Sequence, residues 1–153
     1  MIRSLDTSVW IDLLRRRDSG VTACFSKAAL AQTPMVASTL VLHELETGLV
    51  AGRSSDRRRV QLATLLAQAS VADFTLEDSR SSGALRARLR AAGTPIGEID
   101  TLIAGQALAR GWTVVTRNVR HFGRVEGLPL IDWTVGAEPL SAKVIAARVK
   151  AAE

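Results

Sequence analysis

The chain has 153 residues, of which 47% are hydrophobic, with 20 Lys and Arg against 15 Asp and Glu and a single cysteine, Cys24. This length and apolar content predict one compact domain with its own core, and they exclude a disordered or fibrous protein. One cysteine excludes an internal disulfide and a cysteine-rich zinc site. No apolar run resembles a membrane span or the core of a signal peptide, so we expect a cytoplasmic protein.

In chain order the apolar pattern alternates between short strand-like runs and longer stretches with helical spacing. Strands separated by helices favour an α/β fold, a single domain with a mostly parallel central sheet and helices on both faces. An Ala-rich helical tail follows Pro139. The pattern predicts a strand at 2–5, helices at 9–14 and 21–31, a strand at 35–37, helices at 38–52 and 57–69, a strand at 70–74, helices at 77–92 and 99–110, and strands at 112–115 and 128–132.

The positive charge is carried mostly by arginine. The formal net charge is +5 at pH 7, and arginine runs occur at 15–17 and 57–59. Several guanidinium groups together bind phosphate oxygens well, which favours a nucleic-acid partner. Solvated helix faces carry similar charge runs, so composition alone leaves both interpretations open.

Polar residues follow two of the predicted strands. Asp6 comes directly after the strand at 2–5, and Thr116 and Asn118 come after the strand at 112–115. Ligands of open α/β sheets bind outside the carboxyl ends of the strands, where the strand order reverses, so these side chains are expected to converge. The alternative for Asp6 is a helix N-cap.

Glu44 lies at the edge of the apolar stripe of its predicted helix. Gly48, four residues later, leaves open space over one side of Glu44, although glycine costs about 1 kcal/mol of helix propensity relative to alanine. The alternative for Glu44 is a solvated acid that flanks the stripe. We expect Glu46, on the opposite flank, to be solvated.

Asp100 shares a helix face with Ile103 and Ala104 and is therefore expected within a buried stripe. A buried carboxylate needs a partner, and a bound cation would provide one. The alternative is a favourable interaction with the helix dipole in the first turn. Glu98 is expected to be solvated.

The acids Asp6, Glu44 and Asp100 are hard oxygen ligands of the kind that Mg²⁺ or Mn²⁺ prefers, and such a site suits metal-assisted phosphodiester hydrolysis. Neither a phosphate-binding loop nor a serine nucleophile elbow is present. His43 is expected at the surface. His121 is either a loop residue or lies near the site.

The polar candidates lie in four segments, residues 5–9, 43–48, 99–104 and 115–122. In order and spacing these segments resemble the PIN-domain ribonucleases, and among them the VapC toxins of toxin–antitoxin pairs. The resemblance implies a PIN-like nuclease domain at 1–135, with 136–153 as its C-terminal helical tail. It also implies a Mg²⁺- or Mn²⁺-dependent endoribonuclease that cleaves RNA, forms a homodimer and a higher toxin–antitoxin assembly, and is neutralised by a VapB-type antitoxin whose C-terminal segment enters the active groove.

The resemblance assigns the catalytic and metal-binding acids of the family to Asp6, Glu44 and Asp100, and its site threonine to Thr116. The chain departs from the family at the fourth acid, because Asn118 stands where many relatives carry a carboxylate, and His121 precedes Phe122 where others carry an acid. This departure keeps a second interpretation open, a catalytically weak PIN-fold protein that binds RNA or acts as a scaffold.

Overall fold

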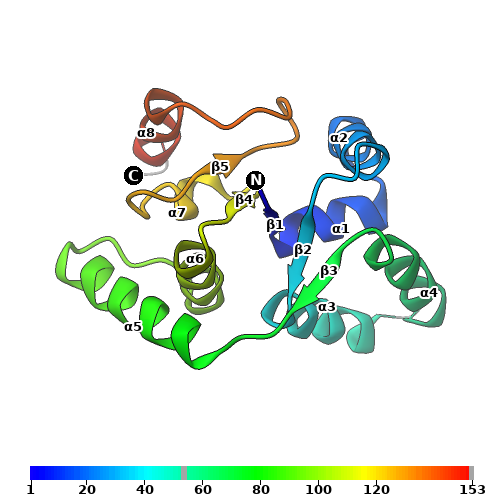
Figure 1. The fold of residues 1–153 in the computed structure, drawn as a ribbon, viewed down its shortest axis with the longest axis horizontal. Helices are drawn as coiled ribbons and strands as arrows, with labels where there is room; N and C mark the ends of the chain where they lie inside the picture. Colours follow the sequence, from blue (N-terminus) through cyan, green and yellow to red (C-terminus); the bar gives the residue numbers. More distant parts are fainter. Residues whose placement is uncertain (53–54, 152–153) are drawn as a thin grey trace.

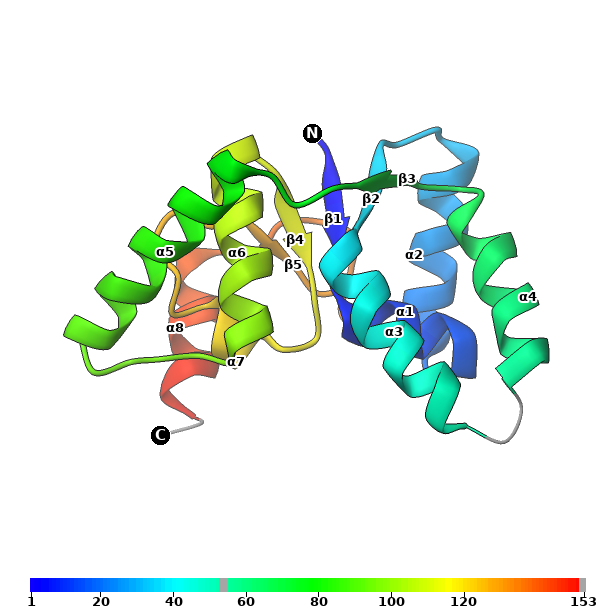
Figure 2. The same ribbon diagram turned by 90° about the horizontal axis from the view of Figure 1, so that it is seen from below.

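In the computed structural model, which describes residues 1–52 and 55–151, five parallel strands form one sheet in the order β3-β2-β1-β4-β5 (Figure 1). Helices pack on both faces of this sheet (Figure 2), so the expected α/β class is confirmed. The elements are β1 (Arg3–Leu5), α1 (Thr7–Arg15), α2 (Ser19–Leu30), β2 (Met35–Ser38), α3 (Thr39–Ala51), α4 (Ser55–Leu66), β3 (Ser70–Ala72), α5 (Leu76–Ala91), α6 (Glu98–Arg110), β4 (Thr113–Val115), α7 (Val119–Phe122), β5 (Leu130–Ile131) and α8 (Ala142–Lys150).

Each strand predicted from the sequence is present, although several elements are shorter than expected. The strand predicted at 70–74 ends at Ala72, and the helix predicted at 57–69 ends at Leu66. The sequence pattern missed α7, because a single helical turn of 4 residues is too short to display a helical period. No helix in the described part of the chain is long and apolar enough to cross a membrane.

The strand order places β1 in the middle of the sheet, between β2 and β4. The chain builds outward from β1 to β3 and then returns to β4 on the other side of β1, so the order reverses between β1 and β4. In Figure 1, α1, α2 and α4 gather beside β2 and β3, whereas α5 to α8 gather beside β4 and β5. Leu5 pairs with Val115, and the Asp6 N–H donates to the Val115 carbonyl at 2.9 Å, so the two strands end together.

Aromatic packing fixes α1 against the sheet next to this reversal point. Trp10 is fully buried, and its indole Nε1 donates to the Leu5 carbonyl at 3.1 Å. Phe25 meets Trp10 and Trp133 edge to face, with ring centroids 6.1 and 6.4 Å apart. Cys24 is half-buried against this core.

The C-terminal helix α8 packs on α7. A side chain at Gly123 would meet Ile145 and Val149 of α8 at 2.8 Å, so the two helices approach closely at this glycine. Arg148 forms an ion pair with the buried carboxylate of Asp132, just after β5. The tail is therefore held by the domain itself.

A buried ion pair holds α5 and α6 together. Asp78 is 1% exposed and accepts two hydrogen bonds from Arg110, at 3.0 Å from Nε and 2.6 Å from Nη2. Burial by itself raises the pKa of Asp78, but hydrogen bonds from Arg110, the Thr75 amide and Gln106 outweigh it and lower the pKa from 3.8 to about 2.

We expect Asp78→Asn to lower the free energy of unfolding near neutral pH by about 2 kcal/mol, from 1.36 kcal/mol per pKa unit. A carboxyl whose pKa is lower in the folded than in the unfolded chain stabilises the fold above its unfolded pKa, and this contribution is lost as the pH falls from about 4 to about 2. Urea unfolding over this range should therefore show a shallower pH dependence for Asp78→Asn than for the wild type. The exposed Asp56→Asn serves as the control, and an unchanged pH dependence in Asp78→Asn would refute the assignment.

Candidate active site

Asp6 lies at the carboxyl end of β1 and is only 4% exposed. Its Oδ2 accepts hydrogen bonds from Thr116 Oγ1 at 2.8 Å and from Ser8 Oγ at 2.9 Å. Asp6 occupies the N-cap position of α1, but its side chain accepts no capping hydrogen bond there. The carboxylate therefore contacts hydroxyl groups both at the end of β4 and in the first turn of α1.

The electrostatic setting of Asp6 is unfavourable for a charge. Burial raises the pKa of Asp6 above its usual value of 3.8, and the nearby charge of Asp100 raises it further, while the hydrogen bonds from Thr116 and Ser8 lower it only in part. Within residues 1–52 and 55–151, no Arg, Lys or His forms an ion pair with Asp6. A carboxylate in such a setting gains strongly from a bound cation.

Asp100, in the first turn of α6, faces two residues at the start of α7. Its side chain is 20% exposed, and its Oδ2 lies 3.0 Å from Asn118 Nδ2 and 2.8 Å from His121 Nδ1. The Asn118 backbone N–H donates to Thr116 Oγ1 at 2.9 Å, so Thr116 connects Asp6 to this second group. His121 thus lies near the other candidate residues, which was one of its two expected positions.

Glu44 reaches the same region from α3. It is half-buried, and its Oε2 accepts a hydrogen bond from the hydroxyl of Thr7, the residue after Asp6. The apolar stripe of α3 is buried as predicted, and nothing would lie within 4 Å of a side chain at Gly48, which leaves the expected open space. Glu44 therefore contacts the first turn of α1 rather than bulk solvent alone.

The residues expected at the surface are found there. Glu46 and Glu98 are exposed, and each pairs with an arginine, Arg59 and Arg86 respectively. His43 is exposed on α3. Their positions exclude them from the group formed around Asp6 and Asp100.

An ion pair next to the site was missed in the sequence. Asp12 is 2% exposed, and Arg117 Nη1 lies 2.9 Å from each of its carboxylate oxygens. The Arg117 amide N–H also donates to Ser8 Oγ at 3.2 Å. These bonds fasten the segment 116–118 to α1. The available signal was Asp12 itself, an acid on the apolar face of a helix, three residues after Val9.

The donors gathered here are carboxylates, a hydroxyl and an amide, which suit a hard divalent cation. In the described residues, no three His, Cys, Asp or Glu side chains lie close enough together to bind one ion. An ion at this edge of the sheet would therefore need further ligands of other kinds, such as the oxygens of Thr116 or Asn118 and water. The buried Asp6, with Asp100 near it and no cationic partner, fits Mg²⁺ or Mn²⁺.

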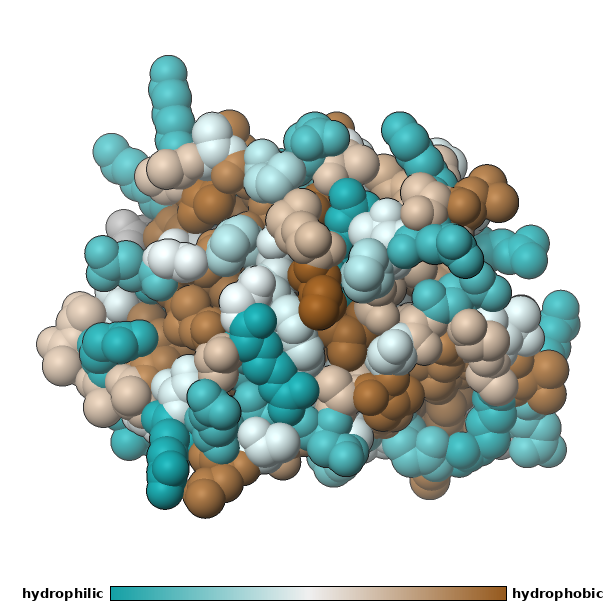
Figure 3. Space-filling model, viewed as in Figure 1, coloured by the Kyte–Doolittle hydropathy of each residue, from teal (hydrophilic) through white to brown (hydrophobic). Residues whose placement is uncertain are grey.

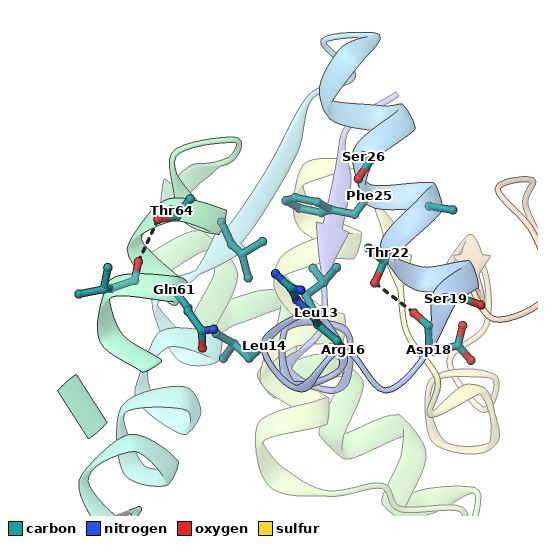
Figure 4. A pocket seen from close by; sticks show the side chains of 13 residues that line it. Leu13, Leu14, Arg16, Asp18, Ser19, Thr22, Phe25, Ser26, Gln61 and Thr64 are labelled. Atoms are coloured by element: carbon teal, nitrogen blue, oxygen red, sulfur yellow. Dashed lines mark hydrogen bonds between the residues drawn. The ribbon is translucent and has the colours of Figure 1, made fainter. Parts of the chain in front are cut away.

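A surface hollow of about 720 Å³ opens between α1, α2 and α4 (Figure 4). Leu13, Leu14, Phe25 and Leu65 supply apolar walls, and polar side chains surround them. A smaller hollow of about 70 Å³ between α1, α3 and α4 shares Leu14 with the first and is lined by Glu44. The two hollows are therefore neighbours at Leu14, and the smaller one borders Glu44.

The chain matches the PIN domain family over residues 4–128. It is 32% identical over 130 residues to the tRNA(fMet)-specific endonuclease VapC of Shigella flexneri, covering 85% of this chain and 96% of the relative. Ribonuclease VapC2 of Rickettsia felis is 29% identical over 133 residues, covering 87% of this chain and 98% of the relative.

Two solved structures agree with these matches. The DNA-bound crystal structure of VapBC2 from Rickettsia felis has a TM-score of 0.80 at 27% identity, covering 86% of this chain and 98% of the other. The DNA-bound VapBC from Salmonella typhimurium has a TM-score of 0.79 at 29% identity, covering 87% and 98%. The chain therefore belongs to the PIN domain family, and within it to the VapC ribonucleases.

Proposed function

We propose that this chain is a Mg²⁺- or Mn²⁺-dependent endoribonuclease toxin that hydrolyses RNA phosphodiester bonds and is neutralised by a VapB-type antitoxin. The observation that carries the proposal is the buried Asp6, which has no cationic partner in the described residues and lies beside Asp100 where the strand order reverses. The ribonuclease relatives add the reaction class. The toxin would act in the cytoplasm, where RNA and the antitoxin are made.

The proposed roles follow from the contacts of each residue. A bound Mg²⁺ or Mn²⁺ would supply activation of a water molecule and stabilisation of the charge on the departing oxygen. Asp6 and Asp100 would hold the ion, and Glu44 would complete the acidic group from α3. The hydroxyl of Thr116 keeps the Asp6 carboxylate in place at 2.8 Å, and the Asn118 side chain lies against Asp100, with Nδ2 and Oδ2 3.0 Å apart.

Exposed arginine side chains would bind the RNA backbone. Arg15, Arg16 and Arg17 are exposed at the end of α1, and hydrophilic side chains are spread over the face of the molecule in Figure 3, between apolar patches. Phosphate contacts of this kind weaken as salt rises, so RNA binding should be salt-dependent. We take tRNA as the first substrate class to test, since the Shigella relative is a tRNA-specific endonuclease.

Purified protein incubated with a mixture of tRNAs, with Mg²⁺, with Mn²⁺ or with a chelator, tests the proposal. We expect cleavage with either metal and none with the chelator.

Asn118 and His121, which replace acids found in relatives, favour the second candidate, a catalytically weak PIN-fold protein that binds RNA or acts as a scaffold. In that case the protein would shift the RNA band in a gel-shift assay but would not cut the RNA with either Mg²⁺ or Mn²⁺.

The antitoxin is proposed from the solved relatives, which are VapBC complexes. An antitoxin segment with apolar side chains would fit the 720 Å³ hollow, and the smaller hollow would lead its next residues past Leu14 to Glu44. A basic side chain there could take the place of the metal charge.

A homodimer is proposed as well, since Leu30 and Val50 are 87% and 70% exposed, and sedimentation at micromolar concentration would test it.

We expect Ala23→Arg to weaken antitoxin binding about a hundredfold, because a large cationic side chain would project into the hollow, a loss of the size seen at interface hot spots. Ala23 is exposed and lines the hollow, so the fold and RNA cleavage should be unchanged. The matched control is Ala31→Arg, at an exposed position that follows α2 and does not line the hollow. Equal affinity of both variants for the antitoxin, which we expect to be encoded directly upstream, would rule out this docking position.

A further inference from the structure

Three side-chain atoms at the junction of α6 and α7 form a nearly equilateral triangle. Asp100 Oδ2 lies 3.0 Å from Asn118 Nδ2 and 2.8 Å from His121 Nδ1, and the two nitrogens lie 2.8 Å apart. All three side chains are partly buried. Each atom therefore has to make a favourable contact with both of the others at once.

With Asp100 ionised, no arrangement of protons satisfies all three contacts. If His121 Nδ1 carries no proton, it accepts from Asn118, but its lone pair then faces the carboxylate. If Nδ1 is protonated, it donates to Asp100 but meets the N–H of Asn118. Turning the Asn118 amide by a half-turn brings its oxygen against the Asp100 oxygen instead. In every arrangement, therefore, either two acceptors or two donors face each other. Such a contact is unfavourable where the groups are shielded from water.

A cation removes this conflict. With the amide turned, the triangle presents three acceptors, namely Asp100 Oδ2, Asn118 Oδ1 and the unprotonated His121 Nδ1. Adjacent ligands of an octahedral ion with metal–ligand distances of about 2.1 Å are about 3 Å apart. The measured separations of 2.8 to 3.0 Å match one face of such an octahedron.

We propose that Asp100, Asn118 and His121 form one face of the divalent-cation site, with His121 Nδ1 as a nitrogen ligand that favours Mn²⁺ over Mg²⁺. The inference rests on the metal dependence in the proposed function and adds the ligand that replaces the missing fourth acid. Imidazole suits transition-metal ions, whereas Mg²⁺ prefers oxygen and binds nitrogen weakly. Exchange of a carboxylate for an imidazole at this position therefore changes which ion is bound best.

Pulsed electron paramagnetic resonance of bound Mn²⁺ tests the ligand directly, because a coordinated imidazole nitrogen couples to the electron spin. The chain has two histidines, which makes the assignment simple in protein without an affinity tag. We expect nitrogen coupling in the wild type and in the matched control His43→Gln, whose side chain is exposed on α3. The coupling should disappear in His121→Gln and in His121→Asp.

Calorimetric titration gives a second readout on the same proteins. Mutation of a residue that only hydrogen-bonds to a metal ligand lowers metal affinity about 10- to 100-fold. Loss of a direct ligand in His121→Gln should therefore weaken Mn²⁺ binding by at least about tenfold. His121→Asp should instead bind Mg²⁺ more tightly than the wild type does. If either variant unfolds, which circular dichroism reports, the other carries the test.

Absence of nitrogen coupling in the wild type, or its persistence in His121→Gln, would overturn the proposal. Two outcomes distinguish failure of the His121 ligand from failure of the proposed ribonuclease function. RNA cleavage with Mg²⁺ or Mn²⁺ but without nitrogen coupling keeps the ribonuclease and removes His121 as a ligand. Nitrogen coupling without RNA cleavage keeps the metal ligand and removes the ribonuclease.

Discussion

Asp6→Asn is expected to reduce RNA cleavage by about a thousandfold or more. A catalytic divalent ion contributes several kcal/mol to transition-state stabilisation, and each 1.36 kcal/mol corresponds to about tenfold in rate. Removing one charge from the buried acid at the end of β1 weakens the hold on that ion while changing the side-chain volume little. Asp100→Asn should reduce RNA cleavage to a similar extent. The control Asp56→Asn, at an exposed position, should cleave RNA as fast as the wild type does.

The same substitution should stabilise the metal-free protein, which separates loss of chemistry from loss of fold. Burial and the charge of Asp100 raise the pKa of Asp6, so the folded state binds a proton more tightly than the unfolded chain does. The stability that this proton gives is present below the unfolded pKa of 3.8 and is lost as the pH rises through the raised pKa. The neutral amide of the Asp6→Asn variant would not carry the charge that is unfavourable near neutral pH.

Melting temperatures in chelator and in Mg²⁺ test this expectation. Near neutral pH in chelator, Asp6→Asn should melt at or above the wild-type temperature. Mg²⁺ should raise the wild-type value more than that of the variant, since a ligand stabilises the state that binds it. Full cleavage by the variant, or equal stabilisation of both proteins by Mg²⁺, would contradict the role of Asp6.

Gly105→Ala is expected to lower the free energy of unfolding by about 3 kcal/mol, the upper part of the usual range for overpacking. A Cβ at Gly105 on α6 would lie 2.3 Å from Ser82 Cα and 2.7 Å from Ser82 N on α5. These are backbone atoms, so relief requires a shift of a whole helix. The close approach is reinforced by Ser81, whose hydroxyl donates to the Gly105 carbonyl at 2.7 Å.

Gly83→Ala is the matched control, because Gly83 lies inside α5 and nothing would lie within 4 Å of its Cβ. This change should raise stability by up to about 1 kcal/mol, the difference in helix propensity between glycine and alanine. Urea unfolding of both variants measures the contrast. Equal effects of the two substitutions would show that the α5–α6 packing tolerates a methyl group at Gly105.

The fold was largely predictable because strands and helices alternate clearly along the chain. The positions of Asp6 and Thr116 followed from one rule, that side chains after parallel strands meet at the same edge of the sheet. The burial of Ile103 and Ala104 beside Asp100 followed from helical spacing. These inferences need only local periodicity and a general rule of topology.

The contacts around α7 could not be predicted in the same way. His121, in a helix too short to show a period, reaches Asp100 across 21 residues. Arg117, just before that helix, reaches Asp12 across 105 residues. The sequence indicated that Asp100 needs a partner and suggested a cation or the helix dipole, whereas the structure places Asn118 and His121 against it. Such contacts depend on tertiary packing, which spacing in the sequence does not encode.

The chemical nature of the RNA ends after cleavage tests the central claim most directly. In metal-assisted hydrolysis water supplies the attacking oxygen, the bond between phosphorus and O3′ breaks, and the proton of the water ends on the departing oxygen. Cleavage of a tRNA in Mg²⁺ and oxygen-labelled water should therefore give a 3′-hydroxyl and a 5′-phosphate that carries the labelled oxygen. A chelator should abolish the cleavage. Products with a 2′,3′-cyclic phosphate, formed by attack of the ribose hydroxyl, or undiminished cleavage in chelator, would contradict a metal-dependent hydrolase built on Asp6, Glu44 and Asp100.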